Sequence, residues 1–274
     1  MTATVAIAAD AIARRIASTI DPMFVLIDGW RDTLEQELSG ASPASSSPSA
    51  PSPSPSAAAL DPTVAALVRP ALDDPRGLIT GAGFVAAPGF LADAPWHLAW
   101  WLSGTNTFRA APEGGVRRLD AVSDPDSEQF RDYTTLEWWR VPERTGTRHL
   151  TGPYVDYLCT DDYTVTITTP VSVGGEMVGL VGTDAYVARI EQELLPVIRS
   201  SGHPCTLVNS SGRIVASTDP RRPTGALLRL TGLAEALAPL HEGAASTDVA
   251  ALAGGQIVVP CGDTSLALVV EGPA

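Results

Sequence analysis

Apolar side chains recur with a helical period over the first forty residues of the chain. Between residues 4 and 39 they return at steps of about three or four, which places them on one side of a helix: Val5, Ile12, Ile16, Ile20, Phe24, Ile27 and Leu34. We therefore expect a long amphipathic helix over 4–39. Proline interrupts the backbone hydrogen bonds of a helix, so Pro22 is expected to kink it or to split it in two.

A tract of Ser, Pro and Ala follows at 41–59, with the sequence ASPASSSPSAPSPSPSAAA. Such a composition buries too little apolar surface to offset the entropy lost on ordering, so we expect a disordered insertion. The helical pattern resumes at once in DPTVAALVRPAL, where Asp61 is expected to cap a second helix and Pro62 to occupy its first turn. Residues 1–77 are thus predicted to form a helical region with one disordered insertion.

From residue 78 the pattern changes to short apolar or alternating runs separated by turn residues, as is typical of β-strands. These runs are LITGAGFVAA, WHLAWWLSG, TVTITTPVSV, EMVGLVGTDA, CTLVNSSGRIVAST and QIVVPCGDTSLALVV. Gly174 and Gly175 favour a hairpin turn between two of the strands, and Ser210, Ser211 and Gly212 favour a second hairpin turn.

Helical patterns return between the strands, at 184–200 and in the segment LTGLAEALAPL. Separate blocks of helix and antiparallel hairpin, rather than a regular alternation of strand and helix, indicate an α+β fold. We expect one antiparallel sheet module at 78–202 and a smaller α+β module at 203–274.

The chain is strongly acidic, with a formal net charge of −13 and a pI near 4.6. Nucleic acid and anionic membranes both require a basic surface, so neither partner is expected. No apolar run reaches the length of a transmembrane helix, and Arg14 and Arg15 follow the N-terminal apolar residues, whereas the basic residues of a signal peptide precede them. A cytoplasmic location is therefore predicted. The three cysteines lack a CxxC spacing and are expected to be reduced thiols.

Motifs of catalysis and metal binding are missing from the sequence. The four histidines are scattered without the spacing of metal ligands, and there is no G-x-S-x-G, Walker A or G-x-G-x-x-G motif. The paired acids Asp161 and Asp162 fit a turn between strands. We therefore expect no catalytic residues, no metal and no cofactor.

Aromatic and acidic residues gather in the centre of the chain, around the Trp138–Trp139 pair and the GPYVDY segment at 152–157. The aromatic pair, GPYVDY, the TVTITTP run and a VGLVGTD run that leads into a helix follow one another in that order. In this order and spacing the chain resembles the Cache superfamily of PAS-like sensor modules over about 4–218. The last strands resemble the smaller module of a double Cache domain, and the Ala/Gly/Pro-rich composition is similar to that of standalone actinobacterial members.

The resemblance implies a ligand pocket on one face of a central antiparallel sheet, closed by an overlying loop. GPYVDY would begin one pocket strand, and the period of a strand would place Tyr154 and Asp156 on the same face. The overlying loop would supply Trp138 and Trp139. Since neighbouring residues of an extended loop point in opposite directions, at most one of these two rings is expected to be fully buried.

Alternation along the YTVTITT run sorts its side chains onto the two faces of the strand. Tyr163, Val165 and Ile167 share one face, which is expected to be covered by helices because it is the more apolar one. The threonines of the opposite face would then turn their hydroxyls toward the ligand: Thr164, Thr166 and Thr168.

Asp184 ends the VGLVGTD run and matches the family aspartate that binds a ligand ammonium group. It could equally cap a helix over 184–200. In amino-acid-binding members of the family, an arginine two residues before the tryptophan holds the ligand carboxylate. Leu136 occupies that position here, and Arg140 is the nearest substitute. Aromatic rings and carboxylates without that clamp favour a cationic ligand.

Together these features predict a cytoplasmic sensor of Cache type that binds a small amine or another nitrogenous metabolite, without enzyme activity. The chain shows no kinase, helix-turn-helix or methyl-accepting segment, so a separate signalling protein is the expected partner, and a homodimer through the N-terminal helix is possible. Three alternatives stay open. They are a sensor of amino acids or organic acids, an interaction module that has lost its pocket, and an enzyme that uses Asp156, Asp184 and Tyr154.

Overall fold

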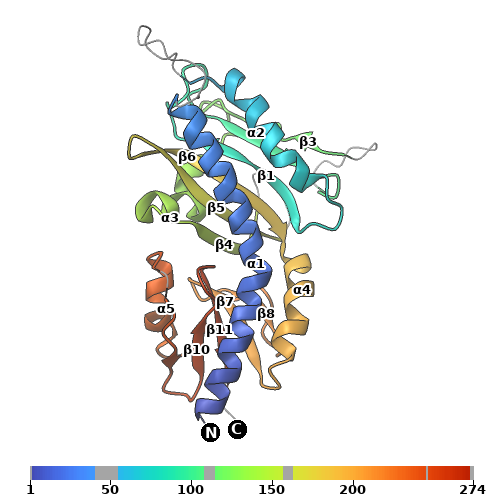
Figure 1. Cartoon of the computed structure of the whole chain (residues 1–274), viewed down its shortest axis with the longest axis vertical. Helices are drawn as coiled ribbons and strands as arrows, with labels where there is room; N and C mark the ends of the chain where they lie inside the picture. Colours follow the sequence, from blue (N-terminus) through green and yellow to red (C-terminus); the bar gives the residue numbers. More distant parts are fainter. Residues whose placement is uncertain (1, 41–54, 108–114, 157–162, 245, 272–274) are drawn as a thin grey trace.

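Two antiparallel sheets lie one above the other along a single long helix, α1 (Thr2–Leu38), which runs the length of the molecule (Figure 1). The computed structural model describes residues 2–40, 55–107, 115–156, 163–244 and 246–271. The other helices of these ranges are α2 (Ala57–Leu72), the 3-10 turn η1 (Tyr133–Thr135), α3 (Glu137–Thr145), α4 (Val187–Arg199) and α5 (Leu233–His241). The fold is α+β, as the sequence predicts.

The first sheet has the strand order β3-β2-β1-β6-β5-β4, and all of its paired strands are antiparallel. Its strands are β1 (Ile79–Ala86), β2 (Leu98–Leu102), β3 (Arg117–Arg118), β4 (His149–Val155), β5 (Tyr163–Val173) and β6 (Glu176–Tyr186). Gly174 and Gly175 connect β5 to β6, both with positive φ, which confirms the first predicted hairpin. The turn needs glycine because side chains disfavour that backbone conformation.

The second sheet has the order β8-β7-β11-β10-β9 and is also antiparallel. Its strands are β7 (Cys205–Asn209), β8 (Ile214–Ser217), β9 (Ala250–Ala251), β10 (Ile257–Pro260) and β11 (Leu266–Val270). The β7–β8 hairpin turns through Ser210, Ser211 and Gly212, as predicted. Cys205 and Cys261 are buried free thiols, while Cys159 lies outside the described residues.

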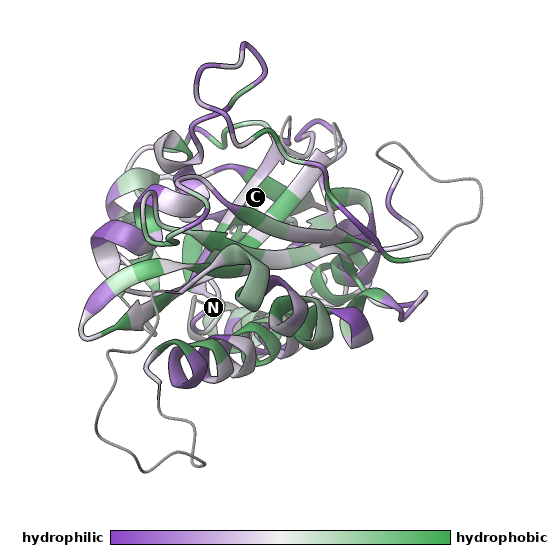
Figure 2. Ribbon diagram, turned by 90° about the horizontal axis from the view of Figure 1, so that it is seen from above, coloured by the Kyte–Doolittle hydropathy of each residue, from purple (hydrophilic) through white to green (hydrophobic). Residues whose placement is uncertain are grey.

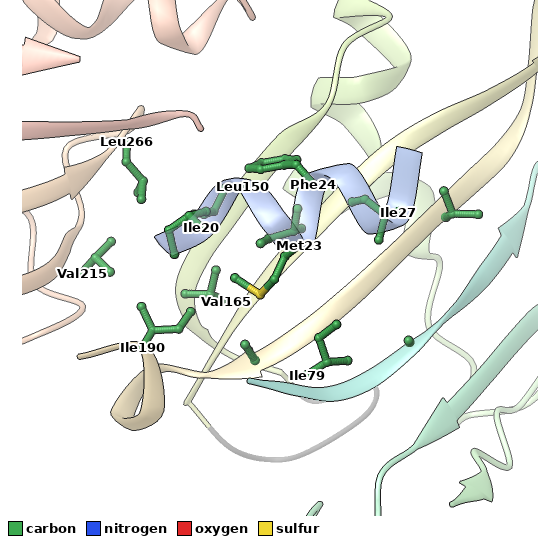
Figure 3. Close-up of a cluster of buried hydrophobic side chains, with 14 of the residues drawn as sticks. Ile20, Met23, Phe24, Ile27, Ile79, Leu150, Val165, Ile190, Val215 and Leu266 are labelled. Carbon is green, nitrogen blue, oxygen red and sulfur yellow. The ribbon is translucent and has the colours of Figure 1, made fainter. Parts of the chain in front are cut away.

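One apolar core joins both sheets to α1. In Figure 3, Ile20, Met23, Phe24 and Ile27 of α1 lie among side chains of the first sheet, of α4 and of the second sheet: Leu150, Val165, Ile79, Ile190, Val215 and Leu266. Seen from above (Figure 2), the helices that cover the α1 side of the sheets turn hydrophilic residues outward and hydrophobic residues toward the strands. The alternation predicted for β5 is correct here, because Val165 and Ile167 belong to this core.

The long N-terminal helix passes Pro22 without a break, so the predicted split is wrong. Proline removes one backbone hydrogen bond, but Ile20, Met23 and Phe24 around it are all buried against the sheets. The packing of that apolar side outweighs the lost bond and keeps the helix continuous. None of the described helices is both long and apolar enough to cross a bilayer.

The second helix begins earlier than predicted. Residues 41–54 of the Ser/Pro tract lie outside the described residues, but α2 already starts at Ala57, with the Ser56 side chain accepting a hydrogen bond from the backbone N–H of Ala59. Asp61 therefore does not cap the helix. Its carboxylate instead contacts His97 and Arg118, whose side chains reach it from beside and within the first sheet.

Two further boundaries differ from the predictions in the centre of the chain. GPYVDY does not begin a strand, because β4 starts at His149 and ends at Val155. The helix expected at 184–200 begins at Val187, and Tyr186 occupies its N-cap position. Asp184 is a strand residue, paired with Thr166 of β5 and Gly81 of β1, so its predicted alternative role as a helix cap is wrong.

Candidate ligand-binding cavity

A small cavity of about 20 Å³ lies on the face of the first sheet that is turned away from α1. Strands β1, β2, β4, β5 and β6 form its floor and sides, and α3 closes it. The lining residues are Val85, Leu98, Trp100, Trp138, Tyr154, Asp156, Thr166, Thr168, Leu180, Gly182 and Asp184. The wall is therefore mainly aromatic and aliphatic, with two carboxylates and three hydroxyls among its side chains.

Glycines in two neighbouring strands, β1 and β6, leave space beside the cavity that a larger side chain would fill. A Cβ at Gly81 of β1 would lie 2.8 Å from Nε1 of Trp100 and 3.1 Å from Oδ2 of Asp184. A Cβ at Gly182 of β6 would lie 2.7 Å from the carbonyl oxygen of Ile167. Real Cβ atoms do not come within 3.0 Å of other heavy atoms. Glycine at 81 therefore leaves space for the indole of Trp100, and glycine at 182 avoids a clash with the backbone of β5.

A chain of hydrogen bonds leads across the floor to Asp184. The hydroxyls of Tyr154 and Thr166 lie 2.7 Å apart, and Oγ1 of Thr166 donates to Oδ1 of Asp184 at 2.6 Å. The other oxygen, Oδ2, is buried and has no hydrogen-bond partner within the described part of the chain. The same is true of the nearby indole N–H of Trp100. The site thus presents one unused acceptor and one unused donor.

Burial raises the pKa of the Asp184 carboxyl well above its ordinary value. The negative charge of Asp156 raises that pKa further, whereas the hydroxyl of Thr166 and the indole N–H of Trp100 lower it slightly. The Trp100 contribution is not a full hydrogen bond, because neither Nε1 of Trp100 nor Oδ2 of Asp184 has a hydrogen-bond partner among the described residues. Burial and a like charge both favour the neutral form of a carboxyl, and they dominate here.

The tryptophan pair lies in helix α3 and not in a loop, which corrects the prediction. Pro142 has no N–H to donate to the carbonyl oxygen of Trp138, and the hydroxyl of Thr168 donates to that oxygen instead, at 3.0 Å. This bond ties α3 to β5 beside the cavity. Consecutive side chains of a helix are about 100° apart, so both rings can be buried on the sheet side.

The structure brings together five of the eight predicted site residues on the cavity wall: Trp138, Tyr154, Asp156, Thr166 and Asp184. The other three do not line it. Trp139 is turned toward Tyr133, with the ring centroids 5.3 Å apart, and is buried in the apolar cluster under η1. Thr164 is buried at the end of the strand, opposite Tyr154.

Arg140 is the third predicted residue that does not line the cavity. It is exposed on the outer side of α3, because it lies about 100° further round the helix than Trp139. Its proposed role as a substitute carboxylate clamp has no support in this geometry.

Sequence reasoning missed Trp100, Gly81 and Gly182 as parts of the site, whereas Thr168 was among the threonines expected to face the ligand and does line the cavity. The signal for Trp100 was present, because the period of a strand places Leu98, Trp100 and Leu102 on one face of β2 and Ala99 and Trp101 on the other. What the sequence lacks is the register between strands. Only that register brings Gly81 opposite both Asp184 and Leu102, and therefore beside the indole.

No cluster of side chains able to hold a metal ion occurs among the described residues. Within the same residues, no basic side chain lines the cavity. The nearest ionic contact on this side of the sheet joins His149 at the start of β4 to Glu137 at the start of α3, with 3.1 Å between Nε2 and Oε1. The chemistry of the wall is therefore that of a neutral or negatively charged pocket with aromatic faces.

Comparison with known proteins extends over both sheets. No family model matches the sequence, and no curated protein matches it. Among solved structures, "Methyl-accepting Chemotaxis protein X" is similar at 17% identity, with 99% of this chain and 97% of that chain covered and a TM-score of 0.60.

Two chemoreceptor domains of named organisms are similar as well. The periplasmic sensory domain of Campylobacter jejuni Tlp1 has 14% identity, coverage of 98% and 93%, and a TM-score of 0.53. The ligand-binding domain of Pseudomonas fluorescens CtaA, in complex with L-leucine, has 17% identity, coverage of 98% and 94%, and a TM-score of 0.50. Likeness over nearly the whole length at such low identity shows a shared fold: this chain has the fold of the Cache-type sensor domains of chemoreceptors.

Proposed function

We propose that this chain is a ligand-binding sensor module whose cavity takes a small ammonium compound. One observation carries the proposal: the buried carboxylate of Asp184 lines an aromatic cavity, and its Oδ2 has no hydrogen-bond partner among the described residues. Removing a carboxylate from water without a partner costs several kcal/mol. A cationic ligand is the partner that would lower this cost.

The aromatic rings add to the attraction for a cation. Trp100, Trp138 and Tyr154 line the same cavity as the carboxylates. A desolvated ammonium against such rings gains on the order of 0.5–2 kcal/mol from the ring quadrupole. Oδ2 of Asp184, which is buried and has no partner among the described residues, is the acceptor we assign to the ligand N–H.

The size of the cavity limits the ligand. Its volume of about 20 Å³ holds little more than one water molecule. A small amine therefore enters only if the lining side chains move apart, and a peptide or nucleotide would need far more space.

An amino acid is the second candidate, and the likeness to a domain crystallised with L-leucine favours it. Asp184 would then bind the α-ammonium group, but the α-carboxylate would need a donor as well. The only orphan donor that we find on the described wall is the indole N–H of Trp100, because Arg140 is exposed on the far side of α3. A neutral donor pairs with a carboxylate less strongly than an arginine does, so we rank the simple amine first.

The enzyme alternative has one observation in its favour, namely the raised pKa of Asp184 beside the Tyr154 hydroxyl. Buried carboxyls of that kind do serve as acids and bases. The solved proteins with this fold reported above are sensory domains, and this likeness favours a binding role. A separate signalling partner, a cytoplasmic location and a dimer through α1 stay predictions.

A thermal-shift series tests the proposal with n-butylamine, choline, L-leucine and succinate on the wild type and on Asp184→Asn. We expect the ammonium compounds to raise the Tm of the wild type, since a ligand at a hundredfold excess over Kd adds roughly 2.7 kcal/mol of stability. Asp184→Asn should remove most of that rise, because the amide keeps the hydrogen bond from Thr166 but not the charge. Arg140→Ala is the matched control and should behave like the wild type. Stabilisation by succinate alone would overturn the proposal.

A further inference from the structure

We propose that Trp100 and Asp184 together select a ligand that carries a neutral oxygen next to its ammonium group, as a vicinal amino alcohol does. Oδ2 of Asp184 accepts from the ammonium group, and the indole N–H of Trp100 donates to the oxygen. This inference rests on the proposed function and names the class of amine that the cavity takes. It makes Trp100 a residue that determines specificity.

Both polar atoms are buried and belong to side chains that line the same cavity. Nε1 of Trp100 and Oδ2 of Asp184 each have no hydrogen-bond partner among the described residues. A buried donor or acceptor that stays unpaired costs free energy. A ligand that pairs both atoms is therefore favoured over one that pairs the carboxylate oxygen and leaves the indole N–H without an acceptor.

The two atoms lie close together, beside Gly81 of β1. A Cβ on that residue would lie 2.8 Å from Nε1 of Trp100 and 3.1 Å from Oδ2 of Asp184. Atoms that are both so near one point can be reached by two neighbouring groups of a single small molecule. In a vicinal amino alcohol the nitrogen and the oxygen are on adjacent carbon atoms, so its two polar groups are close together as well.

Three glycines fix the direction of the indole N–H. Beside Nε1 at Gly81, Cε3 of the same ring lies 2.9 Å from the Cβ position of Gly83. Cη2 lies 3.5 Å from the Cβ position of Gly182. The ring therefore covers all three glycines, and turning it over would carry Nε1 away from Asp184. A donor that is held in place before the ligand arrives loses little freedom on binding.

A neutral oxygen suits this donor better than a carboxylate does. An indole N–H is uncharged, and charge-assisted partners such as arginine hold a carboxylate more strongly. The donor also lies beside the carboxylate of Asp184, which repels a second carboxylate on the ligand. A hydroxyl oxygen accepts the N–H without that repulsion, and it adds little bulk to a ligand that enters a cavity of about 20 Å³.

Calorimetry with three ligands of one skeleton tests the inference. n-Propylamine, ethanolamine and glycine carry a methyl group, a hydroxyl and a carboxylate oxygen at the same distance along the chain from the nitrogen. We expect the wild type to bind ethanolamine about three- to tenfold more tightly than n-propylamine, and glycine more weakly than ethanolamine. Trp100→Phe removes the N–H and retains a ring, so the preference for ethanolamine should be lost.

Trp139→Phe is the matched control. Nε1 of Trp139 is also buried without a partner among the described residues, but that ring does not line the cavity. This variant loses the same kind of group outside the site. The ratio of its Kd values for ethanolamine and n-propylamine should therefore be that of the wild type.

The outcomes separate the two proposals. If the wild type binds ethanolamine and n-propylamine equally well, or if Trp100→Phe keeps the preference, the role of Trp100 is wrong while the ammonium site stands. Tighter binding of glycine than of ethanolamine would show that the recognised oxygen is a carboxylate, and would overturn the inference too. If none of the three ligands binds, the proposed function fails and this inference fails with it.

A variant that does not fold leaves a second measurement on the wild type. The indole N–H groups give separate signals in a proton–nitrogen correlation spectrum. Ethanolamine should move one of these signals to higher chemical shift, as a new hydrogen bond does, and n-propylamine should not. If ethanolamine moves no indole signal in this way, the inference is wrong.

Discussion

The two sheets pack against the same helix, but their opposite faces are covered differently. Both turn one side toward α1 and share its apolar core. On the opposite side, the second sheet is covered by α5 through Leu233, Leu237 and Leu240. The first sheet is covered by α3 and η1, and between them and the strands lies the cavity.

Side-chain chemistry explains the difference. The covered outer face of the second sheet carries Val208, Val258, Ala267 and Val269, which pack directly against leucines. The corresponding face of the first sheet carries Thr166, Thr168 and Asp184 among its apolar side chains, and a helix of leucines could not satisfy these polar groups. Close packing of apolar side chains fills the outer face of the second sheet. On the first sheet, polar groups and small residues leave a cavity under α3. The ligand site that we propose therefore lies on the first sheet.

The largest expected effect would come from a change in the filled face. Leu237 is buried under the second sheet, and Leu237→Ala should lower the free energy of unfolding by about 2–5 kcal/mol through lost apolar contact and a cavity. Urea denaturation measures this, and n-butylamine affinity of the folded fraction should not change. A loss below about 1 kcal/mol would mean that this face has spare room as well, and the comparison would fail.

A smaller effect is expected where the two modules meet. Nδ2 of Asn209 in β7 donates to the carbonyl oxygen of Gly152 in β4 at 2.7 Å, and the contact is buried. Asn209→Ala leaves that carbonyl without this partner and should cost about 1–3 kcal/mol in urea denaturation.

Asn209→Asp is the matched control for that contact. It retains the oxygen that accepts from Ser211 and Arg213 but loses the donor to Gly152. Equal stability of Asn209→Asp and the wild type would show that the contact between the sheets contributes nothing.

Much of this architecture could be predicted from the sequence, because local rules agree with the tertiary structure in most elements. Each of three local patterns predicts its own element without help from distant residues. They are the helical period of apolar residues in α1, the alternation in β5 and the paired glycines of the β5–β6 turn. The predictions from sequence fail where contacts with residues distant in the sequence determine the local structure. Pro22 stays within a helix because two sheets pack around it, and the Trp138 carbonyl tolerates Pro142 because Thr168 replaces the lost donor.

The candidate site was predicted in part for the same reason. Tyr154, Asp156 and Thr166 follow from the period of a strand, which is a local property. Asp184 was ambiguous between strand and helix cap, since the helix begins only three residues later at Val187. The glycine floor and Trp100 depend on the register of β1 with β2 and β6, and no single strand contains that information.

The stability of the empty chain should depend on pH through Asp184. Its folded pKa lies above the ordinary value of 3.8, so between the two values the folded state holds a proton that the unfolded state has lost. The contribution to stability is thus full at low pH and is lost as pH rises toward the folded pKa, at up to about 1.4 kcal/mol per unit. Asp184→Asn should lack this loss.

Urea denaturation of both chains across that range, without ligand, measures the difference. It should grow in favour of Asp184→Asn with rising pH and then level off. If the two chains show no pH-dependent difference in stability, the Asp184 carboxyl does not have a raised pKa. Water would then reach the cavity more easily than the burial of Asp184 in the structure indicates.

Filling the floor of the cavity should weaken binding with little effect on the rest of the first sheet. Gly81→Ala brings a Cβ to 2.8 Å from Nε1 of Trp100, so the indole must move into the cavity. We expect n-butylamine affinity to fall by about tenfold, or roughly 1.4 kcal/mol. Gly89→Ala is a control for a glycine change as such, because its Cβ would meet no atom within 4 Å, although its positive φ adds strain. Unchanged affinity in Gly81→Ala would place the ligand elsewhere.

The smallest effect is expected at Arg140, and it separates this site from an amino-acid site. Arg140 is exposed on α3, and a surface substitution away from special contacts changes stability by about 0.5 kcal/mol or less. Arg140→Ala should therefore leave the Tm and the affinity for n-butylamine as they are, and it should leave any weak binding of L-leucine unchanged. The side chain would have to cross the outer surface of α3 to reach a carboxylate in the cavity, and the buried Trp138 and Trp139 stand between. Calorimetry with L-leucine on both chains is the direct measurement. If Arg140→Ala abolishes L-leucine binding while n-butylamine never binds, then α3 rearranges around its ligand, the arginine acts as the clamp, and the cavity is an amino-acid site.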